Sequence, residues 1–537
     1  MKKPILKNWW VPALLATLAF GIYVRTLGAD FLRWDDRQNI LLNPWIENAT
    51  FSLIWTRSYY NMYIPVTYTF WTLLWHISKS PWIFHLSNLL LHAANTVLVY
   101  HLARRLFKEK DNWWPAFVAA AVFCSHPLQV ETVAWISTGR DLLASFFSLL
   151  AANMVMAART TVPGLWLSTL LFCVSLLCKP SVAVLPAGLL LLAYACDLWT
   201  RPRTTALWLW FIPGFAATIV TKRIQQLDAD LRLPPMDIGR RMLVALDSFG
   251  FYVQKLLAPY PLAADYGRTR EVALNEPLWA ITLAGLLVVA IALYIFRRRL
   301  SKPALGFVAL FGLLLSPVLG LIPFQAQFQS TVSDRYAYLP LMAVGLMCGF
   351  AIKKKAWPAL AVLIAVWGSM TAARAETWMT NELFFTDMLA KNEKSHVALS
   401  SLGVEYILTN RLAEAEVVLK RAIQLKPMDV IPRTNLAQLY LLFNRADLVV
   451  SEIAPLLDDK EFLRINQTET RALASAYRLT GRAHHQFGLW SKANDFYCRW
   501  FQLDYENEEG RAEMGKFMED SRNHQVSLPN CEIRTAN

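Results

Sequence analysis

An adjacent pair of acidic residues and several isolated cations stand at the ends of apolar segments. Asp35 and Asp36 lie in the stretch FLRWDDRQNILLNP. Arg140, Lys179 and Arg335 each stand where an apolar run begins or ends. A carboxylate can take a proton from an attacking nucleophile, and cations can neutralise a phosphate. These residue types therefore predict proton transfer beside a bound phosphate, with the acidic pair as catalytic residues and the cations as the phosphate site.

Further polar residues lie within or beside apolar segments: His126 as another phosphate-binding group, and Glu131, Asp334, His85 and Asn88 as supporting groups. Polar side chains at such places are expensive in a membrane and are candidates for function by default. His85 and Asn88 stand at positions i and i+3 with His92 at i+7, so the three share one face of a helix.

Each candidate also has a purely structural interpretation. Asp35 and Asp36 could form a solvated loop pair, or one could cap a helix while the other is catalytic. Glu131 could simply pair with a nearby cation, and Arg335 could form a local ion pair. Lys179 could extend its side chain to the membrane interface, and the histidines could pack or hydrogen-bond a loop.

Composition separates the chain into two parts. Hydrophobic residues make up 55% of the sequence and charged residues 17%, against about 25% charged in an average soluble protein. Residues 1–375 carry 34 basic and 17 acidic residues, whereas residues 376–537 carry 19 and 23. We therefore predict a membrane domain over 1–375 and a soluble domain over 376–537. The basic excess falls in the membrane part, which favours inner-loop charge over a nucleic-acid surface.

Apolar segments long enough to be spanning helices recur through the first part. We predict about eleven: residues 9–28, 83–103, 113–126, 133–158, 163–178, 181–199, 206–221, 277–296, 304–324, 337–352 and 356–373. Residues 249–262 are shorter and contain two prolines, so we expect an interfacial or re-entrant helix there. In the loop after the first span, aromatic residues predict two amphipathic helices on the outer leaflet, over 44–60 and 65–78.

Basic residues give the orientation. Lys2, Lys3 and Lys7 keep the N-terminus in the cytoplasm, with the first span uncleaved. Alternation then places the basic clusters at the inner side: Arg104–Lys108, Arg159, Arg201 and Arg203, Arg297–Arg299, and Lys353–Lys355. The candidate residues, which were not used to set the orientation, all fall at or near the outer face. That convergence predicts a site there, and eleven crossings place the C-terminal domain outside the cytoplasm.

The C-terminal part contains a repeat. Residues 396–427 read HVALSSLGVEYILTNRLAEAEVVLKRAIQLKP, with small residues and a final proline at tetratricopeptide spacing. Weaker copies follow at 430–459 and 474–505, which predicts an all-α solenoid of about three repeats. Its concave surface could bind a protein or peptide through Tyr406 and Asn435, or the repeats could be a structural cap. Cys498 and Cys531 could pair if this part lies outside the cytoplasm.

Five motifs in series carry a resemblance: FLRWDDRQNILLNP, PVTYTFWTLLW with FHLSNLLLH, SHPLQVETVAWISTGRDLLA, LLCKPSVAVLPAGLLL and SDRYAYLPLM. With the repeats behind them, they resemble the GT-C glycosyltransferases. Within that class the chain is most similar to the transmembrane-and-tetratricopeptide-repeat O-mannosyltransferases and their bacterial relatives.

The resemblance implies a GT-C-like helical membrane domain and an inverting transfer of a sugar from a polyprenyl-phosphate carrier to an acceptor hydroxyl. Asp36 or Asp35 matches the acidic-pair position that holds the catalytic base. The family usually has Lys-Glu where this chain has Lys179-Pro180, so one carboxylate is missing, and the repeat array is short. No nucleotide-binding glycine motif is present, which fits a lipid-linked donor. The one cofactor to consider is a divalent cation beside Asp35 and Asp36, and we predict no firm metal site.

Three hypotheses follow. The first is an O-glycosyltransferase whose repeats engage an extracytoplasmic protein acceptor. In the second the acceptor is a glycan or a lipid and the repeats are structural, and in the third the chain is a non-enzymatic scaffold that recruits partners. The short loops favour a bacterial inner membrane, with the site and the C-terminal domain in the periplasm.

Overall fold

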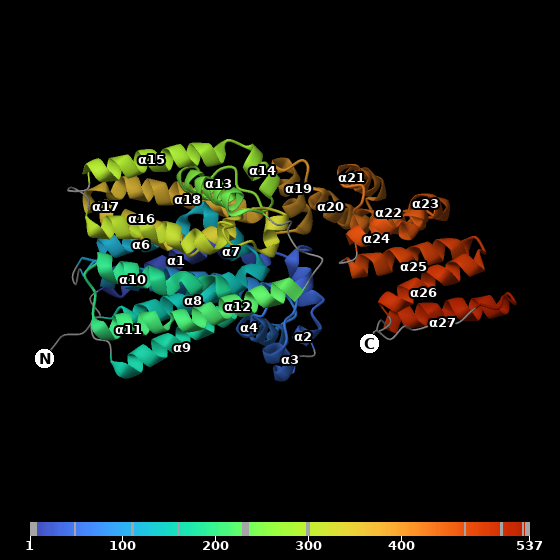
Figure 1. The fold of residues 1–537 in the computed structure, drawn as a ribbon, viewed down its shortest axis with the longest axis horizontal. Coiled ribbons are helices and arrows are strands. Elements are labelled where there is room, and N and C mark those ends of the chain that lie inside the picture. The colour runs from blue at the N-terminus through green and yellow to red at the C-terminus, as the bar shows by residue number, and fades with distance from the viewer. Residues whose placement is uncertain are drawn as a thin grey trace. The chain divides into compact units, whose positions relative to one another are not determined.

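A computed structural model describes residues 8–47, 50–108, 112–157, 161–227, 236–296, 301–466, 469–504, 508–528 and 531. Across these residues the chain is helical and contains no strand, which confirms the predicted all-α class (Figure 1). Contacts divide it into two compact units, Met1–Asp387 and Met388–Asn537. The division falls later than the predicted boundary, because Trp378 and Phe384 are buried within the first unit.

The first unit is built from the following helices: α1 (Trp10–Tyr23), α2 (Pro44–Glu47), α3 (Phe51–Thr56), α4 (Pro65–Ile77), α5 (Pro81–Leu106), α6 (Trp114–Ser125), α7 (Val130–Ala134), α8 (Gly139–Val155), α9 (Val162–Cys178), α10 (Leu185–Ala195), α11 (Arg201–Leu209), α12 (Phe211–Leu227), α13 (Ile238–Leu257), α14 (Arg270–Asn275), α15 (Leu278–Phe296), α16 (Lys302–Leu315), α17 (Leu341–Ala351) and α18 (Trp357–Glu376). Short 3₁₀ turns join them near the candidate residues: Pro127–Gln129, Ile136–Thr138, Pro180–Val184, Ser316–Val318 and Asp334–Ala337. Helix α19 (Asn381–Lys391) then leads the chain into the second unit.

Among the described residues, four helical stretches are long and apolar enough to cross a membrane: Trp10–Gly28, Pro81–Leu106, Arg201–Gln225 and Lys354–Glu376. The pair Trp114–Ser125 and Pro127–Ala134 would be a fifth if it forms one span, bent by 56°. Shorter apolar helices lie at other predicted spans, among them Val162–Cys178 and Lys302–Val318. The predicted number of eleven crossings therefore stays a prediction.

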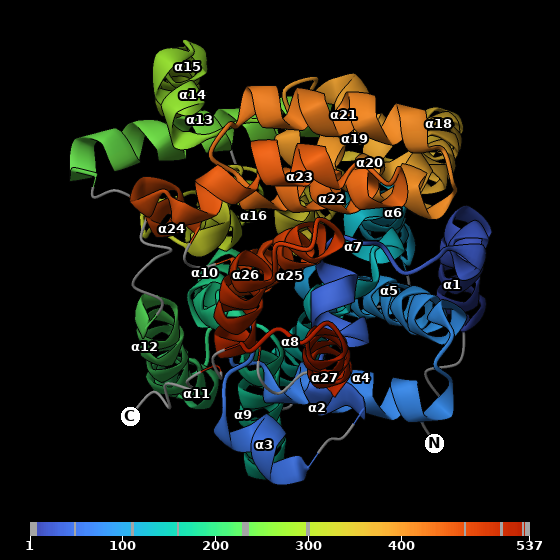
Figure 2. The same cartoon turned by 90° about the vertical axis from the view of Figure 1, so that its right-hand side faces the viewer.

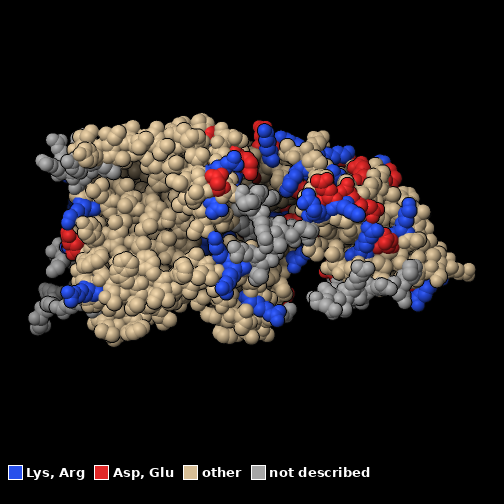
Figure 3. Space-filling view, viewed as in Figure 1, with Lys and Arg blue, Asp and Glu red and all other residues tan. Residues whose placement is uncertain are grey.

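The surface of the first unit is that of an integral membrane protein. Figure 3 shows a flank that is almost free of charged residues, which gather toward the two ends of the helices. Large apolar side chains are exposed on separate helices, among them Trp166 on α9, Phe215 on α12 and Val288 on α15. Such extensive apolar exposure is uncommon on a soluble protein and is suited to lipid.

Two predicted interfacial elements have different bounds in the structure. The expected helix over 249–262 is part of α13, which begins at Ile238 and ends at Leu257, before Pro259 and Pro261. The expected helix over 44–60 is two short helices, α2 and α3, the second of which begins after the cap residue Thr50. The predicted inner-side residues Lys2, Lys3, Lys7, Arg159 and Arg297–Arg299 lie outside the described residues.

Close helix packing brings the loop before α17 against the segment after α6. Helix α17 packs on α6, and α5 packs on both α6 and α8 (Figures 1 and 2). A Cβ atom added at Gly345 would stand 2.3 Å from the Ala119 carbonyl oxygen, so only glycine permits this approach of the two backbones. The motif SDRYAYLP therefore lies beside the motif SHPLQVETVAW, although about 200 residues separate them in the sequence.

The second unit contains α20 (His396–Leu408), α21 (Leu412–Leu425), α22 (Val430–Leu442), α23 (Ala446–Glu452), α24 (Lys460–Asn466), α25 (Thr470–Gln486), α26 (Trp490–Leu503) and α27 (Glu508–Asn523). Three hairpins, α20–α21, α22–α23 and α25–α26, coincide with the three predicted repeats (Figure 2). Gly403 and Gly481 allow the first and third hairpins to close, since a Cβ there would press on Leu419 and Tyr497. A disulfide joins Cys498 to Cys531.

Candidate functional site

Asp36 anchors the first loop to the segment before α8. Its Oδ2 accepts a hydrogen bond from the Leu32 amide at 3.0 Å. Its Oδ1 accepts from the amide and the hydroxyl of Ser137, at 2.9 and 2.5 Å. The side chain is fully buried, and this burial raises the pKa of Asp36 to about 7 against the opposing effect of the hydrogen bonds. Asp36 is thus a structural junction between two loops.

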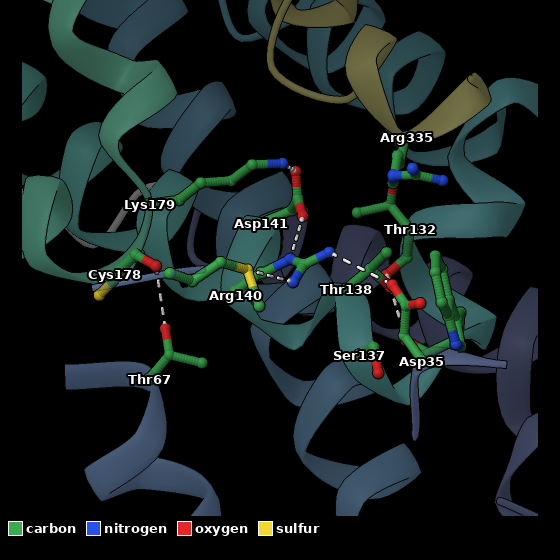
Figure 4. A network of polar contacts seen from close by, with 12 residues as sticks. Asp35, Thr67, Thr132, Ser137, Thr138, Arg140, Asp141, Cys178, Lys179 and Arg335 are labelled. Carbon is green, nitrogen blue, oxygen red and sulfur yellow. Dashed lines mark hydrogen bonds and ion pairs between the residues drawn. The ribbon is translucent and has the colours of Figure 1, made fainter. Parts of the chain in front are cut away.

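Asp35 begins a chain of alternating charges that crosses the helix ends (Figure 4). An Arg140 guanidinium nitrogen lies 3.8 Å from Asp35 Oδ2, and another lies 3.9 Å from Asp141 Oδ2. Asp141 in turn forms a close ion pair with Lys179. The first helical turn of α8 carries Arg140 and Asp141, and Lys179 is the residue directly after α9, so the packing of α8 on α9 makes the chain possible.

A second charged group comes from the loop before α17. Arg335 pairs with the buried carboxylate of Glu131, whose other oxygen accepts from the Arg335 amide at 3.1 Å. The neighbouring Asp334 accepts a hydrogen bond from the Tyr266 hydroxyl at 2.6 Å. Burial, and after it the charge of Glu131, raises the pKa of Asp334 above its ordinary range. Asp334 and Glu131 therefore hold the loop from both sides and fix Arg335 between them.

The two groups meet at one pocket. Lys179 and Arg335 both lie within 6 Å of the centre of the Tyr336 ring, at 5.8 and 5.0 Å. Asp141, Lys179, Arg335 and Tyr336 line the polar part of the pocket. Its other walls are mainly apolar: Val182, Val184, Leu314, Pro317, Val318, Leu339 and Pro340. A pocket with cations at one side and aliphatic walls at the other suits an amphiphilic phosphate.

The acidic pair does not fit a divalent cation. Both carboxylate oxygens of Asp36 are already engaged by backbone and hydroxyl donors. Arg140 lies beside Asp35 and places a positive charge where a cation would have to bind. Within the part of the chain that the structure describes, no three His, Cys, Asp or Glu side chains cluster as metal ligands.

The predicted histidines lie apart from this charge network. His126 caps the turn Pro127–Gln129 by accepting from the Leu128 amide at 3.2 Å, and its ring packs on Trp367. It does not line the pocket of Lys179 and Arg335, and its predicted phosphate-binding role stays a prediction. His85 is buried within α5, one turn before Asn88.

Asn88 on α5 hydrogen-bonds the backbone that leads to Ser137. Its amide donates to the Trp135 carbonyl at 2.8 Å and is 3.4 Å from the Val133 carbonyl. These bonds hold Trp135, the one extended residue between α7 and the turn Ile136–Thr138, and this turn carries Ser137, which donates to Asp36. Asn88 therefore holds the backbone next to Ser137, and its predicted role in supporting the reaction stays a prediction.

The two predicted acceptor residues make contacts inside the second unit. The Arg411 guanidinium covers the Tyr406 ring at 4.1 Å, and the Asn435 amide donates to the Ser400 hydroxyl at 3.2 Å. The structure therefore gives both residues a role in joining neighbouring helices, and their role in acceptor binding stays a prediction.

Sequence reasoning missed several residues of the site. Ser137 anchors Asp36, Met62 places its sulfur 3.0 Å from Arg140, and Tyr336 lies between two cations. The position of Tyr336 beside Arg335 was a usable signal. Ser137 and Met62 gave none, because a serine and a methionine are common in such segments and only the tertiary fold brings them here.

These features define a class: a helical integral membrane protein with a charged pocket among its helix ends, followed by helical hairpins. A segment of the chain is 33% identical over 150 residues to the protein O-mannosyl-transferase Tmtc2 of Drosophila melanogaster. Another match is 34% identical over 158 residues to the mouse protein O-mannosyl-transferase TMTC2, and the human protein matches equally. These matches confirm the resemblance that the motifs predict.

The matched part is limited. It covers 25% of this chain and only 15 to 17% of the length of these relatives. No protein-family model matches the chain. A solved structure, the apo oligosaccharyltransferase of Archaeoglobus fulgidus, aligns over 74% of this chain and 58% of its own, with 11% identity and a TM-score of 0.36.

Proposed function

We propose that this chain is an inverting glycosyltransferase that moves a sugar from a polyprenyl-phosphate carrier to a hydroxyl of an extracytoplasmic protein. The observation that carries the proposal is the pocket in which Lys179 and Arg335 flank Tyr336, with Arg140 linking Lys179's partner Asp141 to Asp35. The matched relatives are named protein O-mannosyl-transferases, which supports a sugar donor and a protein acceptor.

Asp35 is the better candidate for the base. Its side chain is 30% exposed, whereas Asp36 is fully buried and holds backbone amides. A general base must reach the proton of an incoming hydroxyl, so solvent access decides between the two carboxylates. Asp36 then acts as a positioning residue that fixes the loop on which Asp35 stands.

The reaction follows from these positions. The Asp35 carboxylate takes the proton of the acceptor hydroxyl while the oxygen of that hydroxyl forms a bond to the anomeric carbon of the sugar. The bond from that carbon to the phosphate oxygen breaks, and its electron pair leaves with the lipid phosphate. Lys179 and Arg335, with Arg140, neutralise the charge that develops on the departing phosphate. The contacts of Arg140 with Asp35 and Asp141, at 3.8 and 3.9 Å, are longer than hydrogen bonds. Arg140 can therefore turn toward a phosphate.

In this proposal the first isoprene units of the carrier lie against the aliphatic walls of the pocket. Val182 and Leu314 stand on different elements, the turn Pro180–Val184 and α16, and both contribute to one wall. The Cys498–Cys531 disulfide supports an oxidising compartment for the second unit, since disulfides persist outside the cytoplasm. We propose that the site and the repeats lie on the outer side of a bacterial inner membrane and that the repeats engage the acceptor.

The test compares extracytoplasmic proteins by mass spectrometry from cells that carry the full chain or a variant. Asp35→Asn should abolish the sugar adduct, because the acceptor hydroxyl loses its base. Asp237→Asn is the matched control, since this aspartate is exposed at the start of α13 and should leave the adduct unchanged. An adduct that persists in Asp35→Asn would refute the assignment of the base. An adduct found on glycans or lipids in place of proteins would overturn the proposed acceptor.

A further inference from the structure

The loop that follows α1 is hydrogen-bonded to residues at the C-terminal end of the first unit's sequence. The Asp30 amide donates to the Met379 carbonyl at 2.9 Å. Two residues before Asp35, the Arg33 amide donates to the Asn381 side-chain oxygen at 2.6 Å, and the Asn381 amide group donates to the Phe31 carbonyl at 3.3 Å. About 350 residues of sequence separate these partners, so this is a tertiary contact that nothing local requires.

Aromatic packing reinforces the same contact. The Trp34 ring lies 6.0 Å from Phe384 and 6.4 Å from Phe385, and Trp378 lies 4.8 Å from Phe384. Phe384 and Phe385 are buried. We name residues 378–385 the loop clamp. It packs directly against Trp34, the residue before Asp35.

The clamp and Asp36 together leave the loop little freedom. Of the residues before Asp35, the amide of Asp30 is bound by the clamp, that of Leu32 by Asp36 and that of Arg33 by the clamp. A loop with its amides engaged in this way loses the backbone freedom that an open loop keeps. The position of the Asp35 carboxylate is then set by contacts on both sides.

We propose that Asn381 is a positioning residue for Asp35, acting through the two hydrogen bonds that hold the loop backbone. The inference rests on the proposed function, because it concerns the carboxylate assigned there as the base. A displacement of about 1 Å at a reacting group can cost about 100-fold in rate, so a side chain that touches no substrate can still control turnover. Asn381 also opens α19, the helix that leads into the repeat unit.

The experiment measures sugar transfer by the full chain in detergent, with a polyprenyl-phosphate sugar as the donor and peptides from the modified proteins as acceptors. Asn381→Ala should lower kcat at least 10-fold while the KM for the donor changes less than about threefold. Asn381→Asp keeps the oxygen that accepts from Arg33 and should recover a large part of kcat. A change confined to kcat separates positioning from loss of donor binding.

The matched control is Asn153→Ala. Asn153 also bonds backbone with its side chain, donating to Leu98 and Leu149 at 3.0 and 2.9 Å, but it lies on α8 three turns beyond Arg140. It should lower the midpoint of thermal unfolding as Asn381→Ala does, with kcat per folded molecule unchanged. If the two variants have equal kcat, or if Asn381→Ala matches the unmodified chain, the positioning role is overturned.

Two further variants keep the outcome decisive. Should Asn381→Ala fail to fold, Phe384→Leu weakens the same clamp through its packing on Trp34 and must show the same loss confined to kcat. Asp35→Asn is measured in parallel. If it retains activity, the proposed function fails, whereas activity lost in Asp35→Asn and kept in both clamp variants overturns only the role of Asn381.

Discussion

Asp35 and Asp36 are identical neighbours in the sequence, yet their surroundings give them different chemistry. Asp36 sits in a buried position where ionisation is costly, and its pKa rises to about 7. Asp35 keeps access to solvent and lies beside a cation. The pair therefore separates the tasks of holding the loop and of accepting a proton, which adjacent residues of one type cannot reveal in the sequence.

The raised pKa of Asp36 predicts a pH dependence of stability. An aspartate in the unfolded chain titrates at about 3.9, so between pH 4 and 7 the folded protein holds a proton that the unfolded chain has lost. Stability from this group then decreases as the pH rises through that window. In Asp36→Asn the decrease should be smaller, as thermal unfolding in detergent at pH 4.5 and 7.5 would measure.

The control for this comparison is Asp237→Asn, because that aspartate is largely exposed. It should show the same change between the two pH values as the unmodified chain. An Asp36→Asn protein whose midpoint still falls as far as that of the unmodified chain would contradict the raised pKa.

The residues around the acidic pair also predict that transfer needs no divalent cation. Arg140 occupies the side of Asp35 where a metal would bind, and the oxygens of Asp36 are engaged. Activity of the purified chain should therefore survive a chelator at a concentration that removes bound Mg²⁺ and Mn²⁺. Loss of activity with the chelator, and its return when one of these ions is added back, would contradict this prediction.

At the scale of elements, sequence patterns predicted where helices form better than where they end. The apolar runs at 9–28 and 83–103 coincide with the helical stretches Trp10–Gly28 and Pro81–Leu106, since burial and lipid both reward long apolar helices. The helix over 249–262 was misplaced because Arg240, Arg241 and Asp247 interrupt the apolar pattern in the first half of α13, whereas the prolines mark its end.

Part of the site could be predicted from the sequence, because polar residues stand out within apolar segments. Charged residues in apolar surroundings are conspicuous, so Arg140, Lys179 and Arg335 could be found from the sequence. Ser137 donates its amide and hydroxyl to the Asp36 carboxylate, and Asn381 hydrogen-bonds the backbone of the first loop. Only the tertiary fold makes those contacts. Helix packing decides which distant segments meet.

That packing predicts a large cost for a small change at Gly345. A methyl group there would stand 2.3 Å from the Ala119 carbonyl oxygen, so Gly345→Ala must force α17 away from α6. Overpacking of this kind costs roughly 1–3 kcal/mol, and it should also move the loop that carries Arg335. We expect a lower midpoint of thermal unfolding and weaker binding of a polyprenyl-phosphate donor.

Gly285 on α15 provides the comparison. A Cβ atom there meets nothing within 4 Å, so Gly285→Ala should leave donor binding unchanged and should stabilise the helix slightly. If Gly345→Ala behaves like Gly285→Ala, the close approach of α17 and α6 does not govern the position of Arg335.

For the whole molecule, the proposed delivery of a protein acceptor by the repeats requires that the acidic pair and the repeats share one side of the membrane. The first loop, with Tyr60 54% exposed, should then face outward, while the exposed cluster Lys353–Lys355 between α17 and α18 faces the cytoplasm. A membrane-impermeant maleimide applied to intact spheroplasts should label Tyr60→Cys, and should label Lys355→Cys only after permeabilisation. Cys498 and Cys531 should take up the reagent only after reduction, because they form a disulfide. Labelling of both introduced cysteines from the same side would contradict the predicted membrane orientation. It would also contradict the proposal that a lipid-linked donor and an extracytoplasmic acceptor react at Asp35.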